Sequence, residues 1–147
     1  MKIGIATDHG GWELKNQLQK YLEAEGYELV DFGAHQYDAK DDYPDFVLPL
    51  ARAVAAKEVE RGIAVCGSGV GASIAANKIK SIRAALITES YSARQGVEHD
   101  ALNLMCLGGR VIGIELAKEL TNAFLKAIFT GEERHLRRLG KIEAVED

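Results

Sequence analysis

The sequence lacks the features that membrane and secreted proteins need. No apolar run approaches the roughly 18 residues of a transmembrane helix, and residues 1–5 enter a strand-like pattern without a signal-peptide layout. Only two cysteines occur among 147 residues, Cys66 and Cys106, and they form no metal-type pair. These absences predict a cytoplasmic protein with free thiols.

Metal-binding, hydrolase and nucleic-acid signatures are also missing. The four histidines are scattered, without HExxH or His-x-His spacing. The stretch Gly67-Ser68-Gly69 lacks the spacing of a serine-hydrolase elbow. Basic charge is scarce, because 18 Lys and Arg stand against 22 Asp and Glu, whereas nucleic-acid binders are more often basic. We therefore expect no metal, no cofactor, and no nucleic-acid or membrane partner.

The chain does contain a regular alternation of short apolar runs and helical patterns. Expected strands are the run that stops at Thr7 and residues 27–32, 62–65, 84–87 and 104–107; expected helices are residues 12–25, 46–59, 72–78, 90–98 and 111–129. Pro49 lies inside the second helical pattern, where we expect a kink or a later start. The alternation predicts one domain, residues 1–147, with a Rossmann-like three-layer α/β/α fold and a five-stranded parallel sheet.

Reactive side chains gather where this architecture places ligand sites. In open parallel α/β sheets, ligands bind outside the carboxyl ends of the strands. The residues that follow strands are Asp8 and His9, then Cys66 and a glycine-rich turn, then Glu89 and Tyr91, and last Gly108, Gly109 and Arg110.

The glycine-rich turn, residues 67–71, is the most informative of these segments. Its glycines let the backbone approach a ligand closely, and N–H groups at the start of a helix favour an anion such as a phosphate, a carboxylate or an enolate oxygen. Cys66 stands directly before the turn, where these dipoles favour a thiolate that can act as base or nucleophile. The alternative is a small buried side chain beside a tight turn.

The other candidates each have a functional and a structural interpretation. Asp8 and His9 can position a sugar hydroxyl, carry protons or bind an anion, but Asp8 also suits a helix N-cap. The position of His99 near a helix end favours a capping or surface role. Arg134 and Arg138 share one face if the tail is helical and suit phosphate binding, or they belong to a solvated charged tail.

Four motifs, in this order and spacing, resemble the type B ribose-5-phosphate isomerases, a family that also holds galactose-6-phosphate and allose-6-phosphate isomerases. The motifs are residues 8–11, residues 42–44, residues 66–78, and Arg134-His135 with Arg138. The resemblance covers nearly the whole chain. It implies a metal-free aldose–ketose isomerisation of a phosphorylated sugar through an enediolate. The substrate that it favours is ribose 5-phosphate, which is converted to ribulose 5-phosphate in the pentose phosphate pathway.

The resemblance also implies a role for each matching residue. Cys66 is implied as the base that moves a proton between C2 and C1. Ring opening is implied for Ser68 and His99, and sugar contacts for Asp8 and Tyr43. The implied phosphate ligands are His9, Arg110, Arg134 and Arg138. The implied amide donors to the enediolate oxygen are those of Gly67, Ser68, Gly69 and Gly71.

The same resemblance implies a homodimer or homotetramer with sites assembled from two subunits. The tail, residues 132–147, would then pack on a partner subunit. Such an assembly would explain how an enzyme of 147 residues works without a second domain.

Asp100 departs from the family pattern, because Asp100-Ala101 stands where the family usually has Asn-Asp. An ionised carboxylate about 4 Å from the enediolate oxygen would repel it by roughly 4 kcal/mol at an effective dielectric near 20. We expect Asp100 to turn away and leave the turn amides to stabilise the oxygen. It would otherwise be a protonated donor, or would contact a substrate hydroxyl and shift specificity.

Three alternative functions remain open at this point. A hexose 6-phosphate, allose or galactose, can replace the pentose phosphate as substrate. A non-catalytic sugar-phosphate-binding relative is kept open by Asp100. A nucleotide-binding protein is suggested by Gly67-x-Gly69-x-x-Ala72 with Glu89 about 20 residues on, although it leaves Cys66 unexplained.

Overall fold

Short apolar strands form the centre of the protein, for which a computed structural model describes residues 1–146. The strands are β1 (Lys2–Thr7), β2 (Glu28–Asp31), β3 (Arg61–Cys66), β4 (Ala84–Leu86) and β5 (Leu104–Gly108). They pair in parallel in the order β2-β1-β3-β5-β4, with Ile5 opposite Ile63 and Ile63 opposite Met105. The three central strands read as nearly continuous apolar runs because both of their faces are buried.

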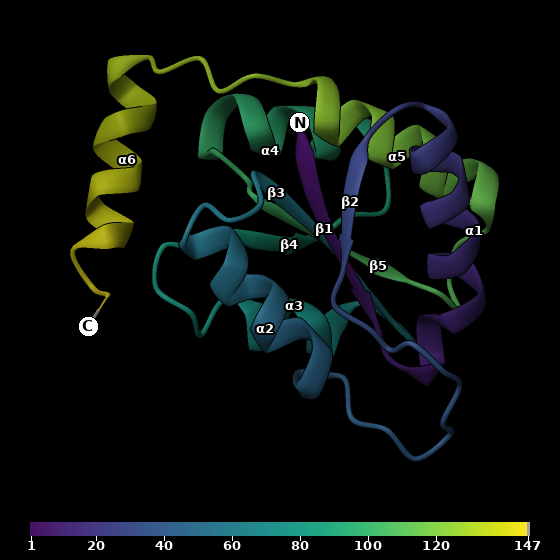
Figure 1. Cartoon of the computed structure of the whole chain (residues 1–147). Coiled ribbons are helices and arrows are strands. Elements are labelled where there is room, and N and C mark those ends of the chain that lie inside the picture. The colour runs from purple at the N-terminus through teal and green to yellow at the C-terminus, as the bar shows by residue number, and fades with distance from the viewer. Residues whose placement is uncertain (147) are drawn as a thin grey trace.

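Helices cover both faces of the sheet (Figure 1). They are α1 (Trp12–Ala24), α2 (Pro44–Ala55), α3 (Val70–Ala76), α4 (Ser90–Asp100), α5 (Ile114–Lys126) and α6 (Glu133–Glu143), with a short 3-10 turn, η1 (His9–Gly11), before α1. Buried residues of α1, α4 and α5 share one core, and those of α2 and α3 share the other. The structure therefore confirms the predicted three-layer α/β fold with a five-stranded parallel sheet.

Two helices differ from their predicted bounds, while the other predicted elements end within two residues of the observed ones. Of the two outcomes expected at Pro49, the later start is wrong. The helix begins at Pro44, whose missing N–H costs nothing in a first turn, and runs through Pro49. It ends at Ala55 because Lys57 turns into the left-handed region, with φ +60°.

The helix predicted at residues 111–129 is shorter at both ends. Gly113 and Ala127 have extended backbones that bound α5. Arg61 donates hydrogen bonds to the carbonyls of Phe124 and Ala127. These bonds satisfy carbonyls that the end of the helix leaves free.

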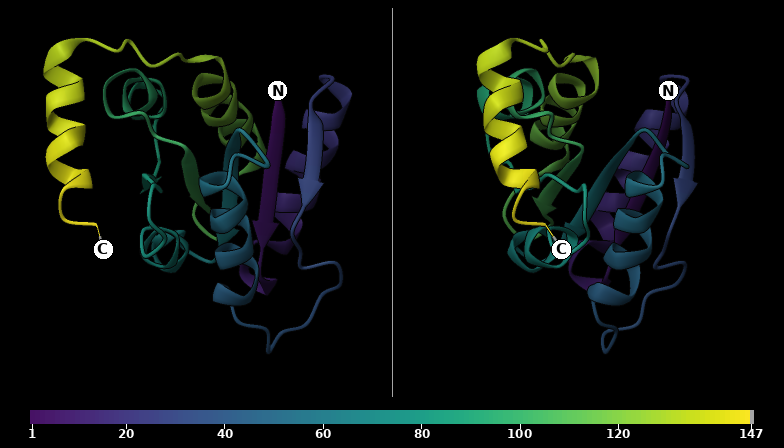
Figure 2. Two further views of the ribbon diagram at one scale, coloured as in Figure 1. Left: turned by 60° about the vertical axis from the view of Figure 1, so that its left-hand side comes forward. Right: turned by 90° about the vertical axis from the view of Figure 1, so that its left-hand side faces the viewer.

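α6 stands at the side of the molecule, joined by a crossing segment that follows α5 (Figure 2). It packs against α4 and buries His135 and Leu139, while Leu136 and Ile142 stay exposed. The helical tail places Arg134 and Arg138 one turn apart, as expected. Among residues 1–146, no helix has both the length and the apolar character that crossing a membrane requires. The last residue of the predicted domain, residue 147, lies outside the described residues.

Candidate active site

The sheet topology reverses direction between the neighbouring strands β1 and β3. The chain continues from β1 to a helix on one face of the sheet, and from β3 to a helix on the other. Such a switch point is where open α/β sheets bind ligands. The loops that follow β1, β3 and β5 meet here backbone to backbone. A Cβ on Gly10 would lie 2.7 Å from the Gly67 nitrogen, and one on Gly109 would lie 2.7 Å from the Gly10 oxygen.

Cys66 is the last residue of β3 and is 4% exposed. Its Sγ accepts a hydrogen bond from the N–H of Gly69 at 3.2 Å. Gly69 has φ +82°, a conformation that favours glycine, and it precedes the first residue of α3. The Ser68 side chain is exposed, and its Oγ accepts a hydrogen bond from the N–H of Val70 at 3.3 Å. The thiol therefore lies beneath a turn that presents several backbone N–H groups.

Arg110 and Tyr43 close over this turn. A Cβ on Gly67 would lie 3.1 Å from Nη1 of Arg110, and one on Gly71 would lie 2.5 Å from Cζ of Tyr43. The N–H of Arg110 also donates to the carbonyl of Gly67 at 3.0 Å. Any side chain at these two glycines would displace the guanidinium or the phenol ring.

Asp8 and His9 complete this group, which we call the strand-end cluster. Its members are Asp8, His9, Tyr43, Cys66, Gly67, Ser68, Gly69, Gly71 and Arg110. Asp8 is 6% exposed, and its Oδ1 accepts a hydrogen bond from the N–H of Gly10 at 2.8 Å. Asp8 therefore caps the short turn η1, whereas the N-cap of α1, the helix for which the sequence suggested Asp8, is Gly11.

Asp41 is a residue that the sequence analysis missed. Its Oδ1 accepts hydrogen bonds from Nδ1 of His9 at 2.7 Å and from the backbone N–H of His9 at 2.9 Å. The pair is 32 residues apart in sequence. Nothing in the polar loop distinguishes Asp41 from Asp42, which follows it, so no sequence signal could have found the contact.

The surroundings of His9 raise its pKa. The hydrogen bond to Asp41 is the largest cause, and the negative charge of Asp8 adds to it. Desolvation and the positive charge of Arg110 oppose the rise. The imidazolium form is thus favoured beside a hollow of about 530 Å³ that carboxylates line. Its lining residues are Asp8, His9, Asp41, Asp42, Tyr43, Pro44 and Asp45.

A metal site is the other chemistry that this corner suggests. Asp8, His9 and Asp41 each bring one possible ligand atom within 4.8 Å of the others. However, Nδ1 of His9 faces Asp41, and Oδ1 of Asp8 accepts from Gly10. We therefore assign a hydrogen-bonded pair here and do not assign a metal.

A second group, the α6 cluster, contains the remaining predicted site residues together with His135; its members are His99, Asp100, Arg134, His135 and Arg138. The rings of His99 and His135 stack with centroids 4.2 Å apart. α6 stands at the outer side of the molecule, away from the ends of β1 and β3, in Figure 1 and in the left view of Figure 2. His99 and Asp100 end α4 shortly before β5 begins, at the edge of the parallel sheet opposite the one where Cys66 ends β3. Within one chain, the structure therefore separates these residues from Cys66.

The α6 cluster has its own electrostatics. Desolvation, His99 and Arg134 together lower the pKa of His135, which is 2% exposed. Nε of Arg134 lies 3.2 Å from Oε2 of Glu132. Arg138 and Asp100 are exposed. The sequence analysis assigned no role to His135. Its stacking with His99 joins two helices that are far apart in sequence, and no local pattern predicts such a contact.

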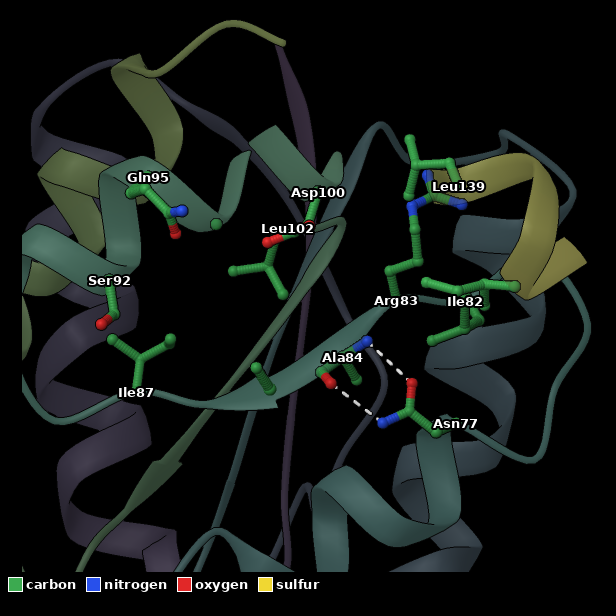
Figure 3. Close-up of a pocket in the computed structure, with 13 residues that line it drawn as sticks. Asn77, Ile82, Arg83, Ala84, Ile87, Ser92, Gln95, Asp100, Leu102 and Leu139 are labelled. Carbon is green, nitrogen blue, oxygen red and sulfur yellow. Dashed lines mark hydrogen bonds between the residues drawn. The ribbon is translucent and has the colours of Figure 1, made fainter. Parts of the chain in front are cut away.

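An apolar cavity of about 380 Å³ separates β4 from α4 and α6 (Figure 3). Ile82, Ile87, Leu102 and Leu139 line it, and Asp100 lies at its edge. The Asn77 side chain exchanges two hydrogen bonds of 2.9 Å with the backbone of Ala84, on the outer edge of β4. The amide group thus pairs with part of the outer edge of β4, whose inner edge is hydrogen-bonded to β5.

Glu89 argues against the dinucleotide interpretation of the glycine-rich turn. Its carboxylate accepts a hydrogen bond from the N–H of Ser92 at 2.9 Å and caps α4. Hydrogen bonds from Ser92 lower the pKa of Glu89. This carboxylate is thus already used by its own helix, whereas the dinucleotide fingerprint requires it for a ribose hydroxyl.

Comparisons with known proteins find relatives that match nearly the whole chain. The sequence profile of a family described as Ribose/Galactose Isomerase matches residues 3–142. Ribose-5-phosphate isomerase B of Escherichia coli (strain K12) is 42% identical over 145 residues, which cover 99% of this chain and 96% of that protein.

Two solved structures superimpose over nearly the whole chain. Ribose-5-phosphate isomerase B of Clostridium thermocellum has a TM-score of 0.95 and 50% identity, covering 99% of this chain and 97% of the other. The Mycoplasma genitalium protein of the same name, solved with bound ribulose-5-phosphate, has a TM-score of 0.93 and 39% identity, covering 99% and 95%.

Proposed function

The chain belongs to the ribose/galactose isomerase family, and from this premise we propose that it interconverts ribose 5-phosphate and ribulose 5-phosphate through an enediolate. The observation that carries the proposal is the buried Cys66 thiol beneath the amide-rich turn, with Sγ 3.2 Å from the Gly69 nitrogen. Proton abstraction beside a carbonyl needs a base and oxyanion donors within one pocket. The thiol and the turn supply both. The ribulose-5-phosphate bound to the Mycoplasma genitalium relative supports a pentose phosphate as substrate.

In this mechanism, Ser68 and His99 assist opening of the sugar ring. The Cys66 thiolate removes the proton from C2 of the open-chain aldose, and the electron pair moves through the C1–C2 bond onto O1. Amides of the turn stabilise the resulting enediolate oxygen. The thiol then returns the proton to C1, while the hydroxyl proton of O2 moves to O1, and the ketose forms.

The strand-end cluster also supplies groups for the rest of the substrate. Asp8 and Tyr43 would contact sugar hydroxyls, and His9 and Arg110 would bind the phosphate. Anchoring a remote phosphate lets its binding energy assist the reacting carbons. Carboxylates line the adjoining hollow and would repel the phosphate, so positively charged side chains are needed to bind it there. Asp100 is exposed, and its orientation away from the enediolate oxygen stays a prediction.

We further propose a homodimer, or a tetramer built from dimers, in which the α6 cluster of one subunit covers the strand-end cluster of the other. The two clusters are separate within one chain, so His99 and the tail arginines reach Cys66 only across an interface. Leu136, Ile142 and Val145 are large apolar side chains exposed on or beside α6. Covering them with a partner chain would remove apolar surface from water.

Replacing Arg134 or Arg138 with alanine is expected to raise KM for ribose 5-phosphate about tenfold or more, with a smaller effect on kcat. The loss of a charge-assisted hydrogen bond, roughly 1.5–3 kcal/mol, sets this magnitude. Steady-state kinetics at several salt concentrations check it, with Arg137→Ala as the matched control, since Arg137 is exposed on the same helix. An unchanged KM in both variants, or equal turnover of unphosphorylated ribose by the wild type, would contradict the phosphate anchor.

A substrate panel in heavy water tests the proposed function. Purified protein is offered ribose 5-phosphate, allose 6-phosphate and galactose 6-phosphate, and both ketose formation and deuterium uptake are followed. We expect the fastest turnover with ribose 5-phosphate, with solvent deuterium entering the product. Faster turnover of a hexose phosphate would reassign the substrate. Binding without turnover or deuterium uptake would identify a non-catalytic relative.

A further inference from the structure

We propose that Asp41 is a positioning residue, which holds His9 with Nε2 as an N–H donor toward the substrate phosphate. This inference rests on the proposed function, in which His9 binds that phosphate. Oδ1 of Asp41 accepts both the backbone N–H of His9 at 2.9 Å and Nδ1 of its ring at 2.7 Å. One carboxylate oxygen thus fixes the main chain and the ring of the same residue.

The burial of Asp41 makes this pairing strong. Its side chain is 9% exposed, and Oδ2 is shielded from solvent without a hydrogen-bond partner among residues 1–146. In that part of the chain, His9 is the one cationic side chain within 4 Å of its oxygens. A poorly solvated carboxylate stabilises a neighbouring positive charge. The pair therefore favours the imidazolium form of His9.

The orientation of the His9 ring means that its charge state decides whether it can bind an anion. Nδ1 points at Asp41, so Nε2 is the ring nitrogen left for a ligand. In the neutral ring with the proton on Nδ1, Nε2 offers a lone pair, which repels a phosphate oxygen. In the imidazolium form, Nε2 offers an N–H instead. While His9 is bound to Asp41, its ring can therefore donate a hydrogen bond to an anion only when it is protonated.

The charged groups around His9 act on it in opposite directions. Asp41 and Asp8 favour the proton, while Arg110 and desolvation disfavour it, and their sum raises the pKa of His9. Asp42 and Asp45 also line the hollow beside the ring. A phosphate approaching this acidic hollow needs a positive charge on His9 together with Arg110. The carboxylate of Asp41 keeps that charge in place as the pH rises.

Asp41→Asn is the variant that tests the proposal, because it keeps the side-chain shape and removes the charge. Asp38→Asn is the matched control, since Asp38 lies in the same loop, is exposed, and its carboxylate accepts a hydrogen bond from the backbone N–H of Lys40 and none from His9 among the described residues. Histidine NMR titrations, with the His9 signal assigned through His9→Gln, give the pKa of His9 in each protein. Kinetics with ribose 5-phosphate and inhibition by inorganic phosphate are measured across the same pH range.

The expected result has a signature that a merely structural role would not produce. The pKa of His9 falls in Asp41→Asn and stays unchanged in Asp38→Asn. Between the pKa of His9 in Asp41→Asn and its pKa in the wild type, the ratio of variant to wild-type KM grows by up to about tenfold for each pH unit. The value of kcat stays within about twofold of the wild type. Below both values the ratio returns toward one. In Asp41→Glu, the pKa of His9 lies between its values in Asp41→Asn and in the wild type.

Two results would overturn the inference: an unchanged His9 pKa in Asp41→Asn, or a KM ratio that does not vary with pH. Failure of the proposed function is distinguishable from either result, because it shows as no turnover of any sugar phosphate by the wild type. In that case the role of Asp41 is still tested by the effect of inorganic phosphate on the pKa of His9. Phosphate must raise the pKa of His9 in the wild type and do so less in Asp41→Asn; equal shifts in both proteins would refute the role of Asp41.

Discussion

Cys66→Ala is expected to lower kcat by roughly 1,000-fold, within the range usual for loss of a general base, while ribose 5-phosphate still binds. The reason is geometric, because Cys66 ends β3 directly beneath the turn amides and its Sγ already accepts from Gly69. Alanine keeps the strand and the turn but leaves no group to take the C2 proton. Kinetics, calorimetric binding and deuterium uptake at C2 should show loss of turnover and exchange with a dissociation constant changed only severalfold.

Cys106→Ala is the matched control, since Cys106 is the other thiol of the chain and lies fully buried in β5. Burial raises the pKa of its thiol, which keeps it protonated. We expect near-normal turnover, with a loss of stability of about 1 kcal/mol from the small cavity. If Cys66→Ala kept turnover within tenfold of the wild type, another group would have to be the base.

The fold could be predicted because apolar runs and helical periodicity are local properties of the sequence. β3 and β5 are continuous apolar segments that end at a cysteine or a glycine, so their burial and carboxyl ends could both be predicted. The strand-end rule correctly predicted that the ends of three strands meet, with Asp8 after β1, Cys66 at the end of β3 and Arg110 after β5.

Contacts between distant segments could not be predicted in this way. The bond between His9 and Asp41 joins residues 32 positions apart, and one aspartate of a polar loop resembles another. The stack of His99 on His135 depends on where the segment after α5 carries the tail. Periodicity predicts which face of a helix is apolar, but it does not identify what covers that face.

The position of α6 gives the second prediction with a large expected effect, a test of the site shared between subunits. One chain carries Cys66→Ala with an intact α6 cluster. The other keeps Cys66 and carries His99→Asn, Arg134→Ala and Arg138→Ala. Each variant alone is expected to form inactive dimers, because every site then lacks either the base or the groups from α6. Sedimentation of each variant checks that it still folds and assembles.

A mixed dimer, purified through a different affinity tag on each chain, distinguishes the two arrangements of the site. If α6 completes the site of the partner, one of the two sites combines an intact Cys66 with an intact α6 cluster, and the other lacks both. By the two-fold symmetry of the dimer, roughly half of the wild-type activity returns from two inactive parents. If each site were instead built within one chain, both sites of the mixed dimer would be defective. An inactive mixed dimer, or a fully active wild-type monomer at assay concentration, would therefore refute the shared site.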